Sequence, residues 1–262
     1  MDSLLQAILL GFIEGLTEFL PISSTGHLLI AQVWLDRRSD LFNVAIQSGA
    51  ILAITLVYRA RLRELATQWR GDAEVRELLY KIVAAFGITA ALGLIAKTLG
   101  VELPETVTPV AIALILGGGV IFAVERWVQH QPVREHIGWG VAVAVGIAQV
   151  VAGVFPGTSR SAAAIFAALL FGLTHRPRAA EFAFIVGIPT MFAATGYELL
   201  KTLGNEAARQ DEPWLELAAA FAVSTAVGFA AVKWLLRYIS GHSFVPFGWY
   251  RIALGTLLLA LL

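Results

Sequence analysis

Two acidic side chains lie within the first apolar stretch of the chain, GFIEGLTEFLPISSTGHLLI at residues 11–30. Glu14 and Glu18 are four residues apart, so a helix places both on one face. Carboxylate oxygens without a nearby lysine suit a hard cation, and the pair predicts a site for Mg²⁺ or Ca²⁺. The alternative is a pair of acids that only hydrogen-bond between helices. Ionisable groups at membrane depth are costly, which favours the functional interpretation.

A run of hydroxyl side chains follows Pro21, where a second helical segment is expected to begin. The free N–H groups of a first helical turn, together with its positive dipole end, form an anion site. Ser23, Ser24 and Thr25 are therefore candidate phosphate-binding residues. His27 follows them on the same helix side and is a candidate general base or nucleophile. Ser24 and a water molecule remain open as alternative nucleophiles.

A second stretch, GIAQVVAGVFPGTSRSAAAIFAAL at residues 146–169, repeats this layout with an arginine in place of the acids. The planar guanidinium of Arg160 can clamp a phosphate through two hydrogen bonds. The polar residues predicted to surround it are Thr158, Ser159, Ser161 and Gln149. Hydroxyls in membrane helices also serve only to satisfy broken backbone, so for the hydroxyls alone both interpretations stay open. Two helix N-termini and an arginine facing two acids suit a diphosphate with a divalent metal.

Arg251 lies deep in the last apolar stretch of the chain. It is predicted either to pair with an acid of the first segment or to contact the ligand directly.

The composition indicates a polytopic membrane protein. The 262 residues are 58% hydrophobic and 15% charged, with a mean hydropathy of +0.74, whereas soluble domains carry about 25% charged residues. The net charge of zero and the lack of a basic tail argue against a nucleic-acid partner. The absence of cysteine excludes disulfides and cysteine-ligated metals.

Six apolar stretches have a length suited to crossing a membrane. They are Leu41–Tyr58, Leu78–Leu99, Val107–Trp127, Glu181–Leu200, Trp214–Leu236 and Pro246–Leu262. Two others, Ser3–Val33 and Ile137–Leu173, are each interrupted by a proline followed by polar residues. Because proline ends one helix and favours the first turn of the next, each of these two regions predicts a re-entrant hairpin of half-helices.

The sequence also repeats itself at an offset near 135 residues. Gly11, Glu14, Pro21 and Ser24 fall on Gly146, Gln149, Pro156 and Ser159. We predict a single membrane domain, 1–262, made of repeat one at about 1–130 and repeat two at about 131–262. Each half contains one re-entrant hairpin and three transmembrane helices. Three spans are an odd number, so the second half must be inverted, which places a binding site at the repeat interface.

Arginine positions predict the orientation through the positive-inside rule. Tyr58–Arg76 holds five arginines, and Arg126–His136 and Gly172–Ala180 hold two each, so all three regions are expected in the cytoplasm. The first hairpin and both termini then start from the outer side. The loop containing Asp36, Arg37 and Arg38 fits this orientation badly.

The motifs EGLTEFLPISSTGHL (Glu14–Leu28), PGTSRS (Pro156–Ser161) and FVPFGWYR (Phe244–Arg251) closely resemble the undecaprenyl-diphosphate phosphatase family of the bacitracin-resistance type. Their order and spacing match over essentially the whole chain. The chain departs from the family pattern where Ala162 and Ala164 replace a glycine and a threonine. That change removes one polar contact but retains the four residues from Thr158 to Ser161.

The resemblance implies a multi-pass enzyme of the bacterial inner membrane that hydrolyses undecaprenyl diphosphate to the monophosphate, the carrier lipid for peptidoglycan. It further implies metal dependence, an active site open to the periplasmic side, and essential roles for Glu14, Glu18, His27 and Arg160. The polyprenyl tail is expected to lie between spans, in contact with membrane lipid.

The main alternative is a flippase for the polyprenyl monophosphate, because inverted repeats with broken helices are common in transporters. A structural protein of the wall machinery is disfavoured by the buried acid pair. The sequence leaves a homodimer as an open candidate for the oligomeric state.

Overall fold

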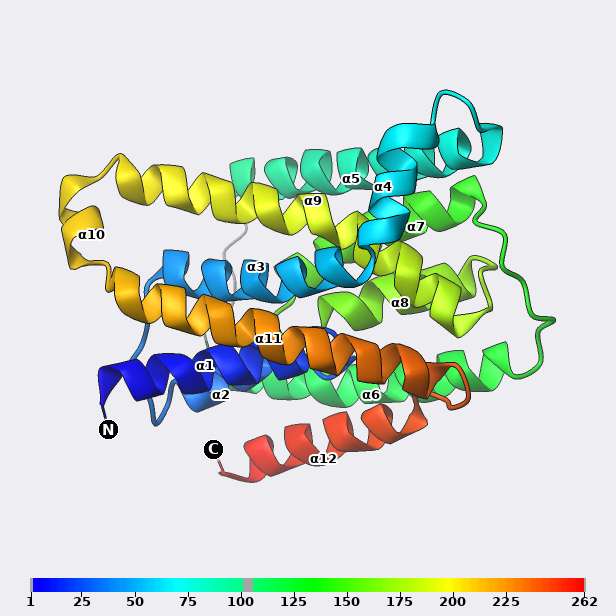
Figure 1. Cartoon of the computed structure of the whole chain (residues 1–262). Helices are drawn as coiled ribbons and strands as arrows, with labels where there is room; N and C mark the ends of the chain where they lie inside the picture. Colours follow the sequence, from blue (N-terminus) through cyan, green and yellow to red (C-terminus); the bar gives the residue numbers. More distant parts are fainter. Residues whose placement is uncertain (1, 101–105, 262) are drawn as a thin grey trace.

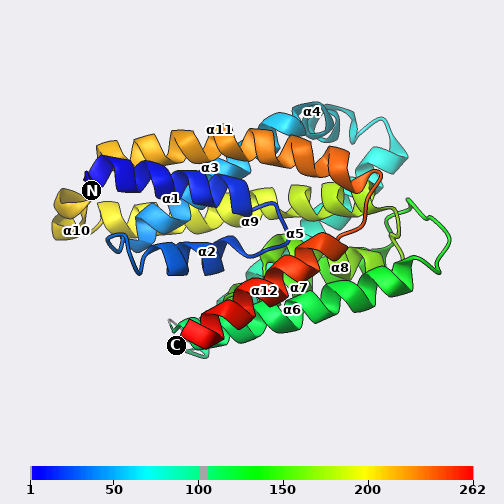
Figure 2. The same cartoon turned by 90° about the horizontal axis from the view of Figure 1, so that it is seen from below.

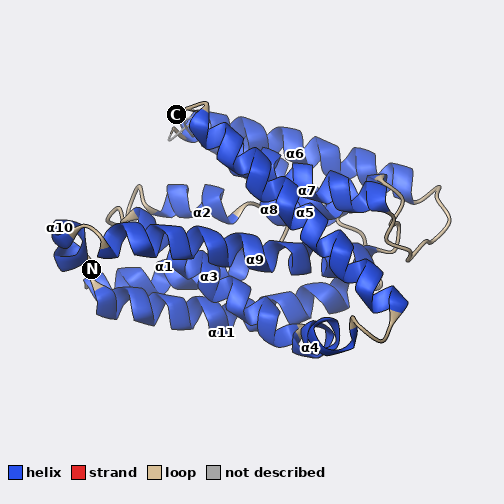
Figure 3. Ribbon diagram, turned by 90° about the horizontal axis from the view of Figure 1, so that it is seen from above, coloured by secondary structure: helices blue, strands red, loops and turns tan. Residues whose placement is uncertain are grey.

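The computed structural model describes residues 2–100 and 106–261, and every regular element in these ranges is an α-helix (Figure 3). The first half contains α1 (Ser3–Thr17), α2 (Ser24–Ala31), α3 (Asp40–Val57), α4 (Arg59–Gln68), α5 (Ala73–Thr98) and α6 (Val107–Val128). The second half contains α7 (Trp139–Val154), α8 (Arg160–Leu170), α9 (Arg176–Leu203), α10 (Glu206–Asp211), α11 (Trp214–Ile239) and α12 (Val245–Leu261). The predicted all-helical architecture is confirmed.

The two halves repeat one order of elements: two short helices, a long helix, a small polar helix and two further apolar helices. Figure 1 shows α1 and α2 entering the bundle from one end and returning to it, whereas α7 and α8 do so from the opposite end. Both termini lie towards the end from which α1 enters (Figure 2). This arrangement is the one expected for an inverted duplication. The limit between the repeats, near residue 130, stays a prediction.

Among the described residues, α3, α5, α6, α9 and α11 are long and apolar enough to cross a membrane. The sixth predicted span corresponds to α12, which has 17 residues, and its predicted last residue, Leu262, lies outside the described range. Helix α5 begins at Ala73, earlier than the predicted Leu78, because the side chain of Asp72 caps a polar first turn. A search for apolar residues alone misses such a turn.

Large apolar side chains also cover the outside of the bundle. Leu94, Leu116 and Trp249 are each more than 60% exposed. Extended apolar surface of this kind is unusual for a soluble monomer and is expected where helices contact lipid. The packing therefore supports the membrane assignment made from composition.

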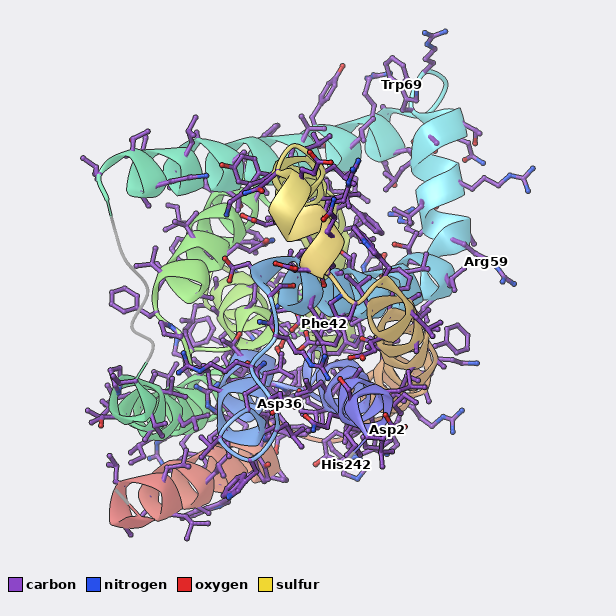
Figure 4. All side chains as sticks on the ribbon, turned by 90° about the vertical axis from the view of Figure 1, so that its left-hand side faces the viewer. Asp2, Asp36, Phe42, Arg59, Trp69 and His242 are labelled. Carbon is purple, nitrogen blue, oxygen red and sulfur yellow. The ribbon has the colours of Figure 1, made fainter. Side chains whose placement is uncertain are left out.

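The small helices α4 and α10 lie between predicted membrane spans. Their residues are mostly polar, so neither gives the long apolar run that identifies a membrane span. Helix α10 is capped by Asn205, whose side chain accepts a hydrogen bond from the N–H of Ala208 at 3.3 Å. Figure 4 shows α4, with Arg59 and Trp69 labelled, at the periphery of the bundle.

Small residues allow the long helices to approach closely around the first hairpin. A Cβ atom at Gly15 of α1 would lie 2.5 Å from the carbonyl oxygen of Ser224 in α11. A Cβ atom at Gly49 of α3 would lie 2.6 Å from the carbonyl oxygen of Phe221 in the same helix. Helix α11 is thus packed against both α1 and α3 at backbone contact distance, as is common for membrane helices.

Candidate functional site

Both hairpins turn through a serine that caps the second half-helix. Ser23 has a φ of 73° and Ser159 a φ of 68°, and they are the only non-glycine residues with positive φ in the described chain. Each hydroxyl accepts a hydrogen bond from a backbone N–H, that of Gly26 at 3.2 Å and that of Ala162 at 3.3 Å. Left-handed serine costs about 1–3 kcal/mol, and such strain concentrates at functional sites. The two tips therefore present matched helix N-termini.

The structure shifts the repeat register by one residue at the tips. The 135-residue offset pairs Ser24 with Ser159, whereas the equivalent N-caps are Ser23 and Ser159. The second tip reaches its cap one residue further from the proline, with Gly157 at a φ of 91° between them. Arg160 consequently occupies the helical position that Ser24 occupies in the first hairpin.

The two acids of α1 are buried side by side below the first tip. Glu14 is 0% exposed, and Glu18, which immediately follows the helix, is 8% exposed. The hydroxyl of Ser24 donates a hydrogen bond to Oε2 of Glu18. Neither carboxylate oxygen of Glu14 has a hydrogen-bond partner. A buried carboxylate without a donor is costly, so its oxygens are available to a ligand.

A small cavity joins the two hairpins. It measures about 30 Å³ and has Glu18 of the first hairpin and Gln149, Arg160 and Ser161 of the second among its lining residues. Such a volume holds about one water or ion. Gln149 is 3% exposed, and its side-chain oxygen and nitrogen both lack partners. Polar residues of both hairpins thus meet at one small cavity, whose other lining residues are apolar.

Arg160 is the cation of this cavity. Its Nη2 donates a weak hydrogen bond to Oε1 of Gln47 at 3.5 Å, and its charge lies within electrostatic range of Glu14. The guanidinium has no carboxylate partner within 4 Å among the described residues. Most of its N–H groups therefore remain available to a phosphate.

His27 is directed towards α12 rather than towards the acids. Its Nδ1 lies 2.7 Å from the carbonyl oxygen of Ser23, and its Nε2 lies 2.6 Å from the hydroxyl of Tyr250. A carbonyl can only accept, so Nδ1 carries a proton and Nε2 of the neutral ring accepts from Tyr250. The two rings are also stacked, with centroids 5.7 Å apart.

The remaining predicted residues have different environments. Ser161 lies 3.1 Å from the hydroxyl of Ser159 and donates to the carbonyl of Leu20 at 3.3 Å, so it links the two tips. Thr25 is partly buried in the first turn of α2. Thr158 borders an apolar groove of about 360 Å³ between α6, α7, α8 and α12. Arg251 does not pair with an acid: its N–H groups all donate to backbone carbonyls.

The donor atoms present fit a hard divalent cation. No group of three His, Cys, Asp or Glu side chains forms a metal cluster among the described residues. Glu14 nevertheless lies within interaction range of Glu18, and the amide of Gln149 borders the same cavity as Glu18. Both oxygens of Glu14 and the amide oxygen of Gln149 lack a hydrogen-bond partner. Mg²⁺ commonly takes only one or two carboxylates and completes its shell with water and substrate phosphate.

Two residues of the site were not predicted from the sequence. Gln47 contacts Arg160, and Tyr250 contacts His27. A polar side chain inside the span at residues 41–58 was itself a signal for Gln47, because buried polar groups in membrane helices are usually functional. Tyr250 gave no such signal, because aromatic residues are common in membrane helices and only the packing of α12 on the tip reveals its partner.

Known proteins resemble this chain over nearly its whole length. A family model described as bacitracin resistance protein BacA matches residues 7–257. The chain is 58% identical over 257 residues to a protein of Rhizobium etli named undecaprenyl-diphosphatase, covering 98% of this chain and 96% of that protein. A protein of the same name from Xylella fastidiosa is 54% identical over 259 residues, covering 99% and 98%. One from Xanthomonas oryzae is 55% identical over 259 residues, covering 99% and 97%.

Proposed function

Because this chain belongs to the bacitracin resistance protein BacA family, we propose that it hydrolyses undecaprenyl diphosphate to undecaprenyl phosphate and inorganic phosphate. Full-length similarity to proteins named undecaprenyl-diphosphatase supports this activity. The structural observation that carries it is the meeting of Glu18 and Arg160 from two inverted hairpins at one small cavity, with Ser24 hydrogen-bonded to Glu18. The reaction recycles the lipid that carries cell-wall precursors.

In this proposal, the tip of the second hairpin, which carries Arg160, binds the phosphate. Arg160 supplies a planar fork of donors and is not neutralised by a neighbouring acid. The N-terminal turns of α2 and α8 add backbone N–H groups and the positive ends of two helix dipoles. Phosphoryl transfer depends mainly on positioning and on stabilising negative charge, and these groups provide both.

Ser24 is the nucleophile that the geometry supports best. Its hydroxyl already donates to Glu18, so the carboxylate is placed to accept the proton. In this step the Ser24 oxygen bonds to the terminal phosphorus and the bond to undecaprenyl phosphate breaks. Water then hydrolyses the phosphoserine, releasing phosphate. His27, held between the Ser23 carbonyl and Tyr250, orients the first turn of α2 rather than activating the nucleophile.

The proposed cofactor is Mg²⁺ or Ca²⁺, held by Glu14 and Glu18 with the amide oxygen of Gln149. Such an ion stabilises the negative charge of the phosphate oxygens during transfer. The two carboxylate oxygens of Glu14 have no other partner, which supports this placement.

The proposed location is the bacterial inner membrane, with the active site open to the periplasm. Five apolar helices of membrane-spanning length support the multi-pass arrangement. The five arginines of residues 58–76 lie on α4, in the turn after it and in the first turns of α5, at the end of the bundle opposite both termini (Figure 1). They support a cytoplasmic position for that end. A homodimer remains a separate proposal, which light scattering of the purified protein tests.

The activity is tested by measuring phosphate release from undecaprenyl diphosphate by the purified protein in detergent, with Mg²⁺, Ca²⁺ or chelator. We expect metal-dependent turnover in the wild type and a kcat/KM lower by about 100- to 1,000-fold in a parallel preparation of Arg160→Ala. Detergent micelles have no second compartment, so a flippase without hydrolytic activity releases no phosphate. Absence of phosphate release by folded wild-type protein at every metal concentration contradicts the proposal.

A further inference from the structure

Arg251 of α12 is completely buried, at 0% exposure, yet none of its hydrogen-bond partners is an acid. A guanidinium has five N–H groups, and here all five can be assigned an acceptor. The acceptors are the carbonyl oxygens of Gly157 (2.9 Å), Ala113 (3.0 Å), Thr158 (3.0 Å), Leu114 (3.3 Å) and Pro21 (3.3 Å). The side chain therefore has no donor left for a substrate.

These five carbonyls belong to three separate segments. Pro21 lies in the tip of the first hairpin, Gly157 and Thr158 lie in the tip of the second, and the other two lie on α6. One side chain thus joins the two tips to each other and to α6. The neighbouring residue, Tyr250, holds His27 of α2 through its hydroxyl. Helix α12 consequently contacts both halves of the site through two adjacent side chains.

We infer that Arg251 is a positioning residue that clamps both re-entrant tips in the geometry required for phosphoryl transfer. The inference rests on the proposed function. It adds that the site depends on a residue that contacts neither phosphate nor metal.

The direction of the tip peptide groups supports this role. In a trans peptide the N–H points away from the C=O, and the described chain has no cis peptide. The bond from Arg251 to the carbonyl of Thr158 therefore turns the N–H of Ser159 away from Arg251. Ser159 is one of the two serines with positive φ, a conformation that persists only where surrounding contacts hold it. Arg251 supplies such contacts.

The space for the guanidinium is created by a glycine on α6. A Cβ atom at Gly117 would overlap the guanidinium of Arg251. A single added methyl group therefore displaces the clamp without changing any residue of the cavity. Gly119, on the same helix, has nothing within 4 Å of an added Cβ atom. It offers a matched control for the effect of alanine on helix α6.

We expect Gly117→Ala to lower kcat about 100-fold, the cost of a displacement of about 1 Å in the reacting groups, with little change in KM. Gly119→Ala is expected to keep wild-type kinetics. Hydrogen exchange provides a second readout that needs no substrate. In Gly117→Ala, peptides covering residues 18–27 and 154–162 are expected to exchange faster, whereas peptides of α3 retain their protection.

Arg251→Lys is the second variant, because lysine keeps the charge but has only three donors and cannot reach five carbonyls. Arg251→Lys should show the same faster hydrogen exchange at the two tips and the same lower kcat. If the Gly117→Ala variant does not fold, Arg251→Lys provides the test instead. Unchanged tip exchange in the folded variants, or a raised KM with unchanged kcat, overturns the clamp and indicates a ligand role. If wild-type protein releases no phosphate, the proposed function fails, while the exchange measurement still tests the clamp.

Discussion

The hairpin α1–α2 and the hairpin α7–α8 share a backbone turn and differ in the charges placed around it. Each begins its second half-helix at a serine with positive φ. In the first, α1 supplies Glu14 and Ser24 opens α2; in the second, Gln149 and Arg160 occupy the corresponding positions. The two turns are alike in backbone, but one lies beside acids and the other carries an arginine. Under the proposed function, the acids would hold the metal and the arginine would bind the diphosphate.

The largest expected effect is a difference in chemical labelling between residues on opposite sides of the membrane, where a position either reacts or does not. The chain has no cysteine, so single cysteines can be introduced freely. Cysteine at Ser39 or Asn205 should react with an impermeant reagent added outside intact cells, and cysteine at Gln68 or His175 only after permeabilisation. Labelling of Ser39 and Gln68 variants from the same side contradicts the inverted-repeat model.

Removing the acids should nearly abolish turnover. Glu18→Gln removes the carboxylate that accepts the Ser24 proton, and we expect kcat to fall about 1,000-fold. Glu14→Gln gives the first hairpin the residue that the second already carries, and should raise the metal concentration needed for half activity. A double variant, Glu14→Gln with Gln149→Glu, should recover part of the metal response. Normal turnover of either single variant across a metal titration argues against a metal site at Glu14 and Glu18.

The next largest effect on turnover is expected from substitutions of Arg160. Arg160→Ala is expected to lower kcat/KM by about 100- to 1,000-fold because it removes the cation opposite the transferred phosphate. Arg160→Lys should lose less, since it keeps the charge but not the planar fork. Wild-type kinetics in Arg160→Ala would place phosphate binding on another residue.

A smaller loss is expected at the histidine of the first tip. His27→Ala removes the bonds to Ser23 and Tyr250 and should lower turnover about 10–100-fold, equivalent to one or two hydrogen bonds. Tyr250→Phe should lower it by about tenfold or less. Ser24→Ala should be far more damaging than either, and mass spectrometry after rapid acid quenching should detect phosphoserine at Ser24. A loss in His27→Ala as large as that in Ser24→Ala would restore His27 as the chemical base.

The smallest effect is expected from removing the serine caps, which tests whether the two turns are equally stabilising. Ser23→Ala and Ser159→Ala each remove a helix cap and should destabilise the protein by about 1 kcal/mol, to a similar extent. Thermal unfolding followed by circular dichroism in detergent measures the difference. Ser→Gly at either position should be milder because glycine accepts positive φ. Clearly unequal losses in the two alanine variants would show that the turns are not energetically equivalent.

The sequence by itself determined the helical class, the two interrupted segments and most spans. Hydropathy and the positions of Pro21 and Pro156 suffice for this, because apolar length and proline act locally. The pairing of Glu14 with Gln149 was also visible as a repeat. Polar helices such as α4 were not predicted, because the prediction relied on long apolar runs and this helix has none.

Only the tertiary structure decided how the tips are held. The sequence showed that Arg251 was buried in a span and left its partner open between an acid and a ligand. The partners are carbonyls from three segments far apart in the chain, and backbone acceptors carry no side-chain signature. The contact of His27 with Tyr250 arises in the same way. Residue type fixed which chemistry was available, and the packing of α12 on both hairpins fixed where each group points.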